Sequence, residues 1–299
     1  MNLLVTGAWS DAKENIEKLT QLGHKVVLLQ QEKDALPCEY PWVEGVICNG
    51  LFLSHPIEQF VNLRYIQLTS AGFDRVPMDY VKAHGIEIHN ARGVYSIPMA
   101  EFAVSGVLQL YKQSRFFAEN QKQHRWEKHR GLIELNGKTV CIVGCGSVGT
   151  ECAKRFKAFG CEVIGIDLFT REDENYNSML PLAALNETLP DADIVVLTLP
   201  LTEETKHQMN KDRFAKMKQG SVLVNIARGA VVDTEALIRA LRTNLSGAVL
   251  DVFEEEPLPA TSPLWNMGNV ILTPHNSFIS DGNAARLAHV ILCSLKKDT

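Results

Sequence analysis

The segment Lys138–Gly149, KTVCIVGCGSVG, decides the fold of this chain. Its first half is apolar, as in a buried parallel strand, and its second half is a G-x-G-x-x-G turn. A helical pattern follows from about Thr150 to Phe159, and a second strand, Cys161–Ile166, leads directly to Asp167. A strand, a glycine-rich turn, a helix and a second strand that ends at an acid together predict a dinucleotide-binding unit.

Each part of that segment has a physical task in such a unit. Gly144 and Gly146 permit a tight turn and a close approach of the backbone to a pyrophosphate, and Gly149 permits close packing of the helix on the strand. The helix begins with unpaired N–H groups that can bind phosphate oxygens. Asp167 can accept hydrogen bonds from ribose hydroxyls and would repel a 2′-phosphate, so we expect NAD rather than NADP. Arg171 could offset this repulsion if it folds back.

The segment Met217–Asp233, MKQGSVLVNIARGAVVD, contains the most informative single side chain. Its apolar centre, Ser221–Ile226, predicts a strand that is covered on both faces, as in a parallel sheet. Arg228 follows at the carboxyl end of that strand, where open α/β sheets bind their ligands. Because a guanidinium can bind a carboxylate through two parallel hydrogen bonds, Arg228 is a candidate for binding an acidic substrate.

Two later predicted strands are followed by side chains that are candidates for acid/base chemistry. The predicted strand Gly247–Leu250 is followed by Asp251 and then by Glu256, and the predicted strand Val270–Leu272 is followed by His275. Histidine is the usual proton donor near neutral pH, and a carboxylate can hold its ring in place. These side chains therefore predict an acid/base pair at the same edge of the sheet as the arginine.

Plainer interpretations exist for several of these residues. Arg228 alone would be interpreted as a surface arginine, and His275 alone as a histidine at the edge of the core. Their common position after predicted parallel strands favours a functional site. Glu254 and Glu255 have no such support, and we interpret them as a solvated acidic run.

Together these segments resemble the D-isomer-specific 2-hydroxyacid dehydrogenases. The resemblance covers nearly the whole chain and is firmest in the range Gly144–His275. The segment Asp191–Thr205 resembles the middle signature of that family, and the segment around Arg228 resembles its most diagnostic one. The resemblance implies that Arg228 binds the substrate, that His275 is the acid/base and that Glu256, directly before a proline, is the partner of the histidine.

The resemblance also implies an NAD site that is built from several loops. The residues expected to contact the cofactor are Gly144, Gly146, Ser147, Val148, Gly149, Asp167, Leu199, Pro200, Thr205, Ile226, Ala227 and Asp251. Among them, Asp251 is expected to hold the nicotinamide carboxamide. Thr198, Cys145 and Ser147 differ from the residues that many members carry, which affects the expected contacts with the pyrophosphate.

The spacing of apolar strands predicts an α/β fold with two doubly wound parallel-sheet domains. Five short strands are expected before residue 95: Leu3–Thr6, Lys25–Leu29, Gly45–Cys48, Arg64–Leu68 and Ile86–Ile88. At least six more are expected later: Thr139–Val143, Cys161–Ile166, Asp193–Leu197, Ser221–Ile226, Gly247–Leu250 and Val270–Leu272. The second series is typical of a Rossmann NAD-binding domain, and the first resembles the flavodoxin-like substrate domain of the family.

The chain is expected to cross between these domains twice. One helix, from about Ile97 to Phe117, would begin after an N-cap at Ser96 and lead into the second domain. A helix from about Asp281 to Leu295 would return to the first. The expectation is therefore a discontinuous substrate (catalytic) domain, residues 1–95 plus 281–299, into which an NAD-binding Rossmann domain, residues 96–280, is inserted.

The resemblance implies an active site in the cleft between the two domains. The loop Thr69–Gly72 consists of small residues after a predicted strand, and its backbone N–H groups can form a concave site for an anion. We therefore expect Ser70, Ala71 and Gly72 to bind the substrate carboxylate together with Arg228. The alternative is an ordinary turn.

These observations predict an oxidoreductase that transfers a hydride between NAD(H) and a small D-2-hydroxy acid or 2-oxo acid. One alternative is a phosphorylated substrate, as in phosphoglycerate dehydrogenases, for which Arg64, Arg75 and Arg92 are candidate ligands. Arg92 and Tyr95 are expected near the cleft. A formate dehydrogenase is disfavoured, because that branch pairs its histidine with an amide and the partner here is Glu256. An alternative from another class is an NAD(H)-sensing, corepressor-like binding protein.

Composition and charge argue against other classes of protein. The 299 residues are 45% hydrophobic and carry a formal net charge of −5, which disfavours nucleic acid and anionic membranes as partners. No apolar run is long enough to span a membrane, and the N-terminal MNLLVTG resembles a strand rather than a signal peptide. The seven cysteines form no C-x-x-C pair, so we expect free thiols, a cytoplasmic protein and no metal site.

Apolar residues on and after the linking helix bear on the oligomeric state. They are Phe102, Val107, Leu110, Tyr111, Phe116, Phe117 and Trp126. Because such residues can form a contact between two copies, and because the family implies it, we expect a homodimer. The same residues could instead belong to the core of the domain.

Overall fold

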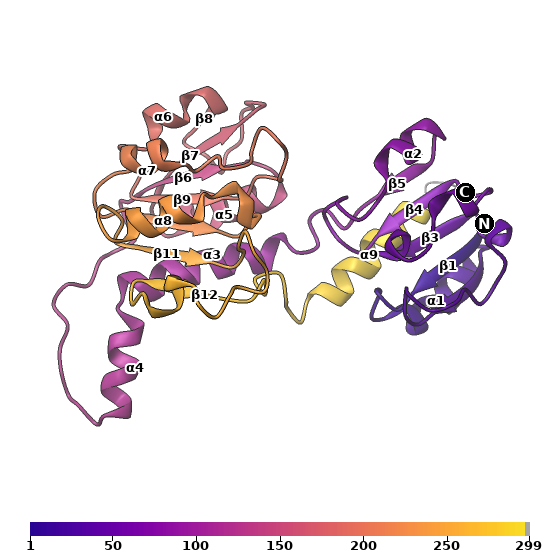
Figure 1. The fold of residues 1–299 in the computed structure, drawn as a ribbon, viewed down its shortest axis with the longest axis horizontal. Helices are drawn as coiled ribbons and strands as arrows, with labels where there is room; N and C mark the ends of the chain where they lie inside the picture. The colour runs from indigo at the N-terminus through magenta and orange to yellow at the C-terminus, as the bar shows by residue number, and fades with distance from the viewer. Residues whose placement is uncertain (297–299) are drawn as a thin grey trace. The chain divides into compact units, whose positions relative to one another are not determined.

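The computed structural model describes residues 1–296, which divide into two compact units (Figure 1). One unit consists of Met1–Tyr95 and the chain from Ser280 onward, and the other consists of Ser96–Ile279. Each unit is built on a parallel sheet with hydrophobic clusters on both faces. The predicted fold class is confirmed.

The first unit contains a five-stranded sheet in the order β2-β1-β3-β4-β5. Its strands are β1 (Asn2–Thr6), β2 (Lys25–Leu29), β3 (Gly45–Cys48), β4 (Tyr65–Leu68) and β5 (Glu87–His89). Its helices are α1 (Ala12–Gln21), α2 (Met78–Ala83) and α9 (Asn283–Lys296), with short 3-10 turns η1 (Tyr40–Trp42), η2 (Leu51–Leu53) and η3 (Ile57–Gln59). The returning helix α9 packs on the sheet through buried Leu287, Ile291 and Leu295.

The second unit contains a seven-stranded sheet in the order β12-β11-β10-β9-β6-β7-β8. Its strands are β6 (Thr139–Val143), β7 (Glu162–Asp167), β8 (Ser178–Pro181), β9 (Ile194–Leu197), β10 (Val222–Asn225), β11 (Gly247–Leu250) and β12 (Val270–Leu272). Its helices are α3 (Ser96–Tyr111), α4 (Ser114–Lys122), α5 (Ser147–Ala158), α6 (Leu185–Thr188), α7 (Lys211–Lys216) and α8 (Thr234–Leu241), with η4 (Leu182–Ala184), η5 (Gly229–Val231) and η6 (Pro263–Asn266).

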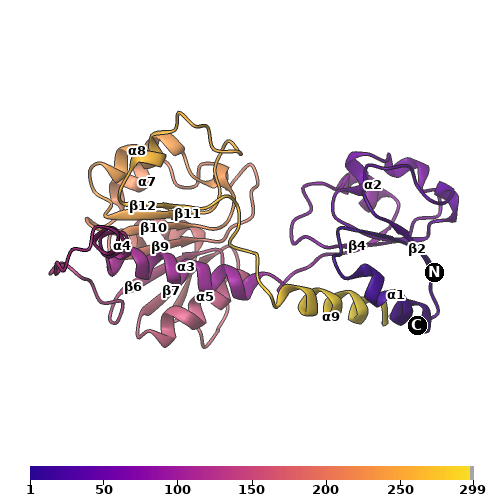
Figure 2. The same ribbon diagram turned by 90° about the horizontal axis from the view of Figure 1, so that it is seen from below.

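The strands of the second unit are apolar on both faces because helices cover both faces. Figure 2 shows α3 and α5 on one side of the sheet and α7 and α8 on the other. Gly106 lets α3 lie close to the sheet, because a Cβ at that position would be 2.5 Å from a methyl group of Val249. All the strands are parallel, so their carboxyl ends, and the loops that follow them, lie at one edge.

The linking helix differs from the prediction. Instead of one helix from Ile97 to Phe117, the chain forms α3 and α4, because Gln113 adopts a left-handed conformation with φ of 54° between them. Ser96 is the first residue of α3 and not a cap outside it. Val107 and Tyr111 are buried in the core of this unit, so they do not form a surface.

The start of one helix and the presence of one strand also differ from the prediction. Helix α5 begins at Ser147, directly after the glycine turn, and not near Thr150. The edge strand β8 has only four residues, includes Pro181 and lies half exposed, so its sequence lacks the long apolar run that marked the central strands.

Candidate active site

The glycine turn after β6 has the geometry of a dinucleotide loop. Gly144 has a positive φ of 99°, and a Cβ on Gly149 would lie 2.1 Å from the carbonyl oxygen of Gly144. A Cβ on Gly146 would meet no atom within 4 Å, so the turn is open at this point. Ser147 and Val148 belong to the first turn of α5, where backbone N–H groups have no partner within the helix. The turn therefore leaves space for a pyrophosphate at the start of a helix.

Asp167 closes this turn from the end of β7. Its carboxylate accepts hydrogen bonds from the N–H of Cys145 at 2.6 Å and from the N–H of Phe169 at 3.3 Å. Arg171 does fold back, since it donates to the carbonyl oxygen of Cys145 at 2.9 Å and pairs with Asp173 at 3.0 Å. Burial acts to raise the pKa of Asp173, but hydrogen bonds from Asn175 and Arg171 lower it below its ordinary value.

The loop after β9 holds the glycine turn from the other side. The hydroxyl of Thr198 donates to the carbonyl oxygen of Gly144 at 2.5 Å, a role that the sequence did not indicate. The hydroxyl of Thr205 donates to the carbonyl oxygen of Pro200 at 2.7 Å and so shapes this loop. The other predicted cofactor contacts in the loops after β9 and β10 are buried: Leu199, Ile226 and Ala227.

Arg228 lies in the loop after β10, and a buried amide fixes that loop. The side chain of Asn225 accepts from the N–H of Ala227 at 3.1 Å and donates to the carbonyl oxygen of Arg228 at 3.2 Å. Gly229 is required next, because a Cβ there would lie 1.8 Å from the carbonyl carbon of Phe253. The arginine loop therefore contacts the loop after β11 directly.

His275 and Glu256 are brought together by the loops after β12 and β11. Nδ1 of His275 lies 2.9 Å from Oε2 of Glu256, and the other oxygen of that carboxylate accepts from the N–H of Phe253 at 3.0 Å. Nε2 of His275 has no hydrogen-bond partner in residues 1–296, so it remains available for a substrate. Because β12, β11 and β10 are neighbours, this pair and Arg228 lie at adjacent strand ends.

Asp251 supports the histidine loop. It is fully buried, and its carboxylate accepts from the hydroxyl of Thr273 at 2.6 Å and from the N–H groups of Asn276 at 2.7 Å and Ser277 at 3.0 Å. The N–H of His275 also donates to the carbonyl oxygen of Asp251 at 2.8 Å. These bonds hold His275 in a left-handed conformation with φ of 51°.

Glu254 is exposed, as expected for a solvated acid, but its two hydrogen bonds to other loops were not predicted. Its carboxylate lies 2.6 Å from Nε2 of His207 and accepts from the N–H of Thr234 at 2.8 Å. Burial acts to raise the pKa of Glu254, but the bonds from Thr234 and His207 outweigh it and lower that pKa. Glu255 is also exposed, as expected.

The predicted residues of the first unit follow β4 and β5. Ser70, Ala71 and Gly72 lie directly after β4, at the carboxyl edge of the sheet. Arg64 lies before β4 and pairs with Glu44 at 3.4 Å, so it is at the opposite edge and does not join them.

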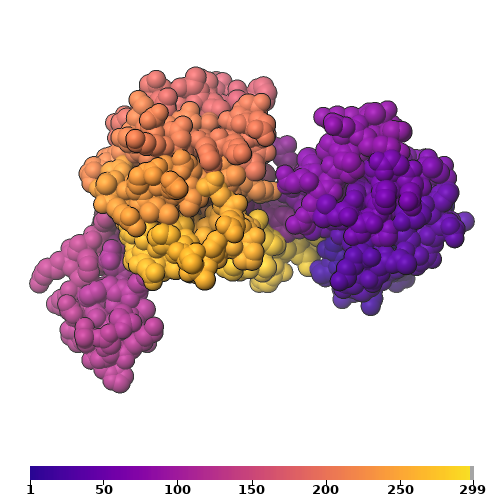
Figure 3. Space-filling view, in the orientation of Figure 1, coloured from indigo at the N-terminus to yellow at the C-terminus, as the bar shows by residue number. Residues whose placement is uncertain are grey.

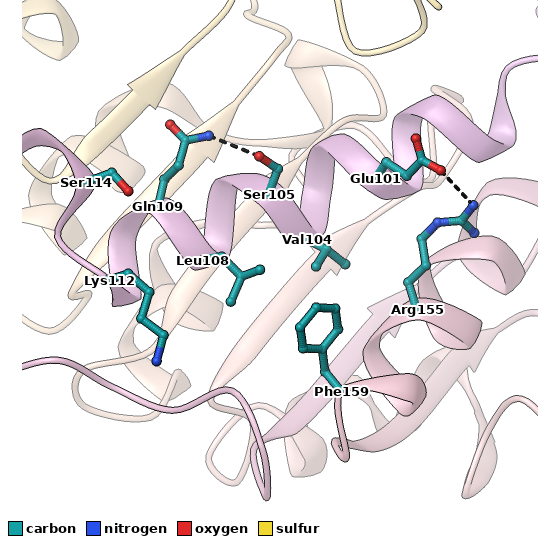
Figure 4. A pocket seen from close by; sticks show the side chains of 9 residues that line it. All are labelled: Glu101, Val104, Ser105, Leu108, Gln109, Lys112, Ser114, Arg155 and Phe159. Carbon is teal, nitrogen blue, oxygen red and sulfur yellow. Dashed lines mark hydrogen bonds and ion pairs between the residues drawn. The ribbon is translucent and has the colours of Figure 1, made fainter. Parts of the chain in front are cut away.

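We also searched residues 1–296 for a metal site, for a helix that could span a membrane and for a pocket. No group of three or more His, Cys, Asp or Glu side chains in residues 1–296 could hold a metal ion. No helix in the same range is long and apolar enough to cross a membrane. A groove of about 460 Å³ on α3 and α5, with Val104, Leu108 and Phe159 among its lining residues (Figure 4), contains none of the predicted site residues.

The chain matches the family model described as D-isomer specific 2-hydroxyacid dehydrogenase, NAD binding domain, over residues 104–277. A glyoxylate reductase of Thermofilum pendens is 38% identical over 252 residues, which cover 82% of this chain and 72% of that protein. A D-isomer specific 2-hydroxyacid dehydrogenase family protein from Aeromonas salmonicida has a similar structure, with a TM-score of 0.86 and 32% identity over 97% of this chain and 93% of that one. The structure of a D-lactate dehydrogenase from Aquifex aeolicus, complexed with NAD and lactic acid, gives a TM-score of 0.79 and 29% identity over 99% of this chain and 95% of the other.

Proposed function

The chain belongs to the D-isomer specific 2-hydroxyacid dehydrogenase family, an NAD-dependent family of oxidoreductases, and from this we propose that Arg228, Glu256 and His275 are its catalytic residues. The reaction is hydride transfer between NAD(H) and a small 2-hydroxy acid or 2-oxo acid. The observation that carries the residue assignment is the 2.9 Å contact of His275 with Glu256 at the strand ends next to Arg228.

The unit Ser96–Ile279 is proposed as the NAD-binding domain and the other unit as the substrate domain. The open turn at Gly146 and the helix start at Ser147 fit a pyrophosphate, because backbone N–H groups there have space for its oxygens. Asp167 is proposed to bind the ribose. Asp251 is proposed to bind the carboxamide, although in this structure it is fully buried and its carboxylate is bonded to the loop that holds His275. When bound, the cofactor supplies or accepts the hydride, while the protein orients the reactants and polarises the substrate.

Arg228 is proposed to bind the carboxylate of the substrate and the oxygen at its C2 carbon. In reduction, negative charge grows on that oxygen, and a fixed guanidinium stabilises the charge more strongly than mobile water does. Asn225 and Gly229 contribute indirectly, since they fix the backbone from which the guanidinium extends. In the first unit, the N–H groups of Ser70–Gly72 are proposed to bind a substrate carboxylate.

His275 is proposed to exchange a proton with the same oxygen. Glu256 binds Nδ1, so the exchangeable proton is carried by Nε2. In reduction the protonated ring donates this proton, and the carboxylate of Glu256 stabilises the imidazolium before the transfer. In oxidation the neutral ring accepts the proton from the 2-hydroxy group.

An assay of NADH oxidation with a panel of 2-oxo acids tests this function. The wild-type protein is expected to reduce at least one of them, and His275→Ala should lower kcat/KM by about 100-fold or more. His289→Ala is the matched control, because His289 is an exposed histidine on α9. Consumption of none of the acids by the wild-type protein would contradict the function; equal activity of the two variants would contradict the residue assignment.

We also propose that the protein is a homodimer that associates through α4 and the segment after it. This part projects from the second unit (Figure 3), and Trp126 within it is 99% exposed. Phe117, Leu132 and Ile133 add further exposed apolar surface. Apolar residues that gather on a projecting segment are typical of an interaction site. Light scattering at micromolar concentration should give the mass of two chains and, for Trp126→Asp, of one; an active wild-type monomer would contradict this.

A cytoplasmic location is proposed from the cysteines. In residues 1–296 all seven thiols are free, and five of them, Cys48, Cys141, Cys145, Cys152 and Cys161, are buried. Free thiols are typical of proteins that work in a reducing compartment.

A further inference from the structure

The loop Thr69–Gly72 has all four of its carbonyl oxygens bound by donors of the same unit. The donors, in order along the loop, are the hydroxyl of Tyr95 at 2.5 Å, the N–H of Ala91 at 2.9 Å, the side-chain amide of Asn90 at 2.6 Å and the hydroxyl of Ser70 at 3.1 Å. Three of these donors come from the segment that follows β5, the strand next to β4. The orientation of the peptide groups in this loop is therefore set by its neighbour.

In contrast to the carbonyl oxygens, three N–H groups of the same loop have no hydrogen-bond acceptor within the described residues. Among residues 1–296, none accepts a hydrogen bond from the N–H of Ser70, Ala71 or Gly72. Thr69 is buried, whereas Ser70, Ala71 and Gly72 are small and partly exposed, so an approaching ligand would meet the backbone of these three residues. Consecutive N–H groups without internal partners form a site for an anion only if the carbonyl oxygens between them point elsewhere.

The roles of Asn90 and Tyr95 as hydrogen-bond donors follow from their own surroundings. The amide oxygen of Asn90 accepts from the N–H of Arg92 at 3.2 Å, which leaves its nitrogen to donate to Ala71. Tyr95 is half-buried, and this burial raises its pKa, so its hydroxyl keeps its proton and remains a donor at neutral pH.

We propose that Asn90 and Tyr95 are positioning residues for the substrate. They hold the carbonyl oxygens of Ala71 and Thr69 away from the site, so that the N–H groups of this loop face the substrate carboxylate. If either donor is lost, a peptide group can rotate and present a carbonyl oxygen to that carboxylate, which repels it. This inference rests on the proposed function, which assigns the loop to the substrate.

The variants Asn90→Ala and Tyr95→Phe test it, and the first unit offers a matched control for each. The amide of Asn62 also donates to a backbone carbonyl at 2.6 Å, that of Pro41, but at the opposite edge of the sheet. Tyr80 lies on α2, where its ring stacks on His84. Asn62→Ala and Tyr80→Phe therefore remove the same chemical groups without touching the loop.

The measurements are kcat and KM for pyruvate, or for whichever 2-oxo acid the wild-type enzyme reduces best, and Kd for NADH. The inhibition constant of the corresponding uncharged amide, such as pyruvamide, is measured as well. Both test variants should raise KM for the acid by about tenfold, which corresponds to the loss of about one hydrogen bond to a charged group. The inhibition constant of the amide, Kd for NADH and both control variants should remain close to wild type.

The possible failures can be told apart. If binding of the acid and binding of the amide are weakened by the same factor in the test variants, this inference is wrong although the enzyme is active. It is also wrong if the KM values of the test variants equal those of their control variants. If the wild-type protein reduces no 2-oxo acid, the proposed function itself is wrong. If Asn90→Ala does not fold, Tyr95→Phe decides, because it removes only a hydroxyl group.

Discussion

Nε2 of His207 lies 2.6 Å from Oε1 of Glu254, so the loop after β9 is tied directly to the loop after β11. The other oxygen of Glu254 accepts from the N–H of Thr234, the first residue of α8. One carboxylate therefore connects loops that follow three neighbouring strands, two residues before the catalytic candidate Glu256.

This connection predicts a pH-dependent contribution to stability. The pKa of Glu254 is lower in the folded protein than its ordinary value, so its contribution is complete above the unfolded value of about 4.3 and is lost as the pH falls through the folded pKa. At pH 6 to 7, Glu254→Gln should lower Tm by about 1 to 3 °C. The difference should disappear toward pH 3, where a protonated glutamic acid resembles glutamine.

Thermal unfolding at several pH values checks this, with Glu255→Gln as the control because Glu255 is the exposed neighbour. A Tm difference for Glu254→Gln that is the same at pH 3 and pH 7 would mean that the charge of Glu254 does not contribute.

The enzyme is predicted to prefer NADH over NADPH by about tenfold or more in kcat/KM, because the charge of Asp167 repels a 2′-phosphate. Arg171 folds back to the same turn, but Asp173 binds it and offsets its charge. Since this pairing offsets only part of the positive charge beside the turn, Arg171→Ala should reduce the remaining activity with NADPH more than the activity with NADH. Equal kcat/KM values for the two cofactors in the wild-type enzyme would contradict this prediction.

Replacement of Arg228 by lysine is predicted not to be conservative. Lysine keeps the positive charge but loses the planar arrangement of donors that fits a carboxylate. We expect kcat/KM for the 2-oxo acid to fall by about 100-fold, with Kd for NADH nearly unchanged. Arg239→Lys on α8 serves as the control, because Arg239 is exposed and its side chain bonds only to Glu235 within residues 1–296. If the Arg228→Lys variant kept nearly wild-type activity, the substrate-binding role assigned to Arg228 would be contradicted.

Much of the second unit could be predicted because its strands are short apolar runs with polar ends. Thr139–Val143, Gly247–Leu250 and Val270–Leu272 have the predicted bounds. The break between α3 and α4 could not be predicted, since the residue in the left-handed conformation is Gln113 and not a glycine.

The polar side chains at the strand ends were recognised, but their bonds were not. Glu254 resembled its solvated neighbours because its partner, His207, is distant in sequence and is brought close only by the fold. Thr198 and Asn225 were missed as supports for the same reason, since each binds a backbone group of another loop or turn. Such residues carry no local signal except a polar side chain at the end of an apolar strand.

The central claim is that ionised Glu256 holds His275 as the proton donor, and the variant Glu256→Gln tests it most directly. Glutamine can still bind the ring but removes the negative charge that favours the imidazolium. Reduction needs the protonated ring, so the alkaline limb of kcat/KM against pH should move to lower pH. Below that limb, activity should recover substantially, whereas His275→Ala should lower it at every pH.

The decisive measurement is therefore the pH profile of kcat/KM for reduction of a 2-oxo acid by the wild-type enzyme and by Glu256→Gln. The limb is compared between the two proteins as a macroscopic property of the enzyme and is not assigned to a single residue. A shift of the alkaline limb to lower pH with recovery below it is the predicted result. An alkaline limb that stays in place in Glu256→Gln would contradict the role assigned to Glu256.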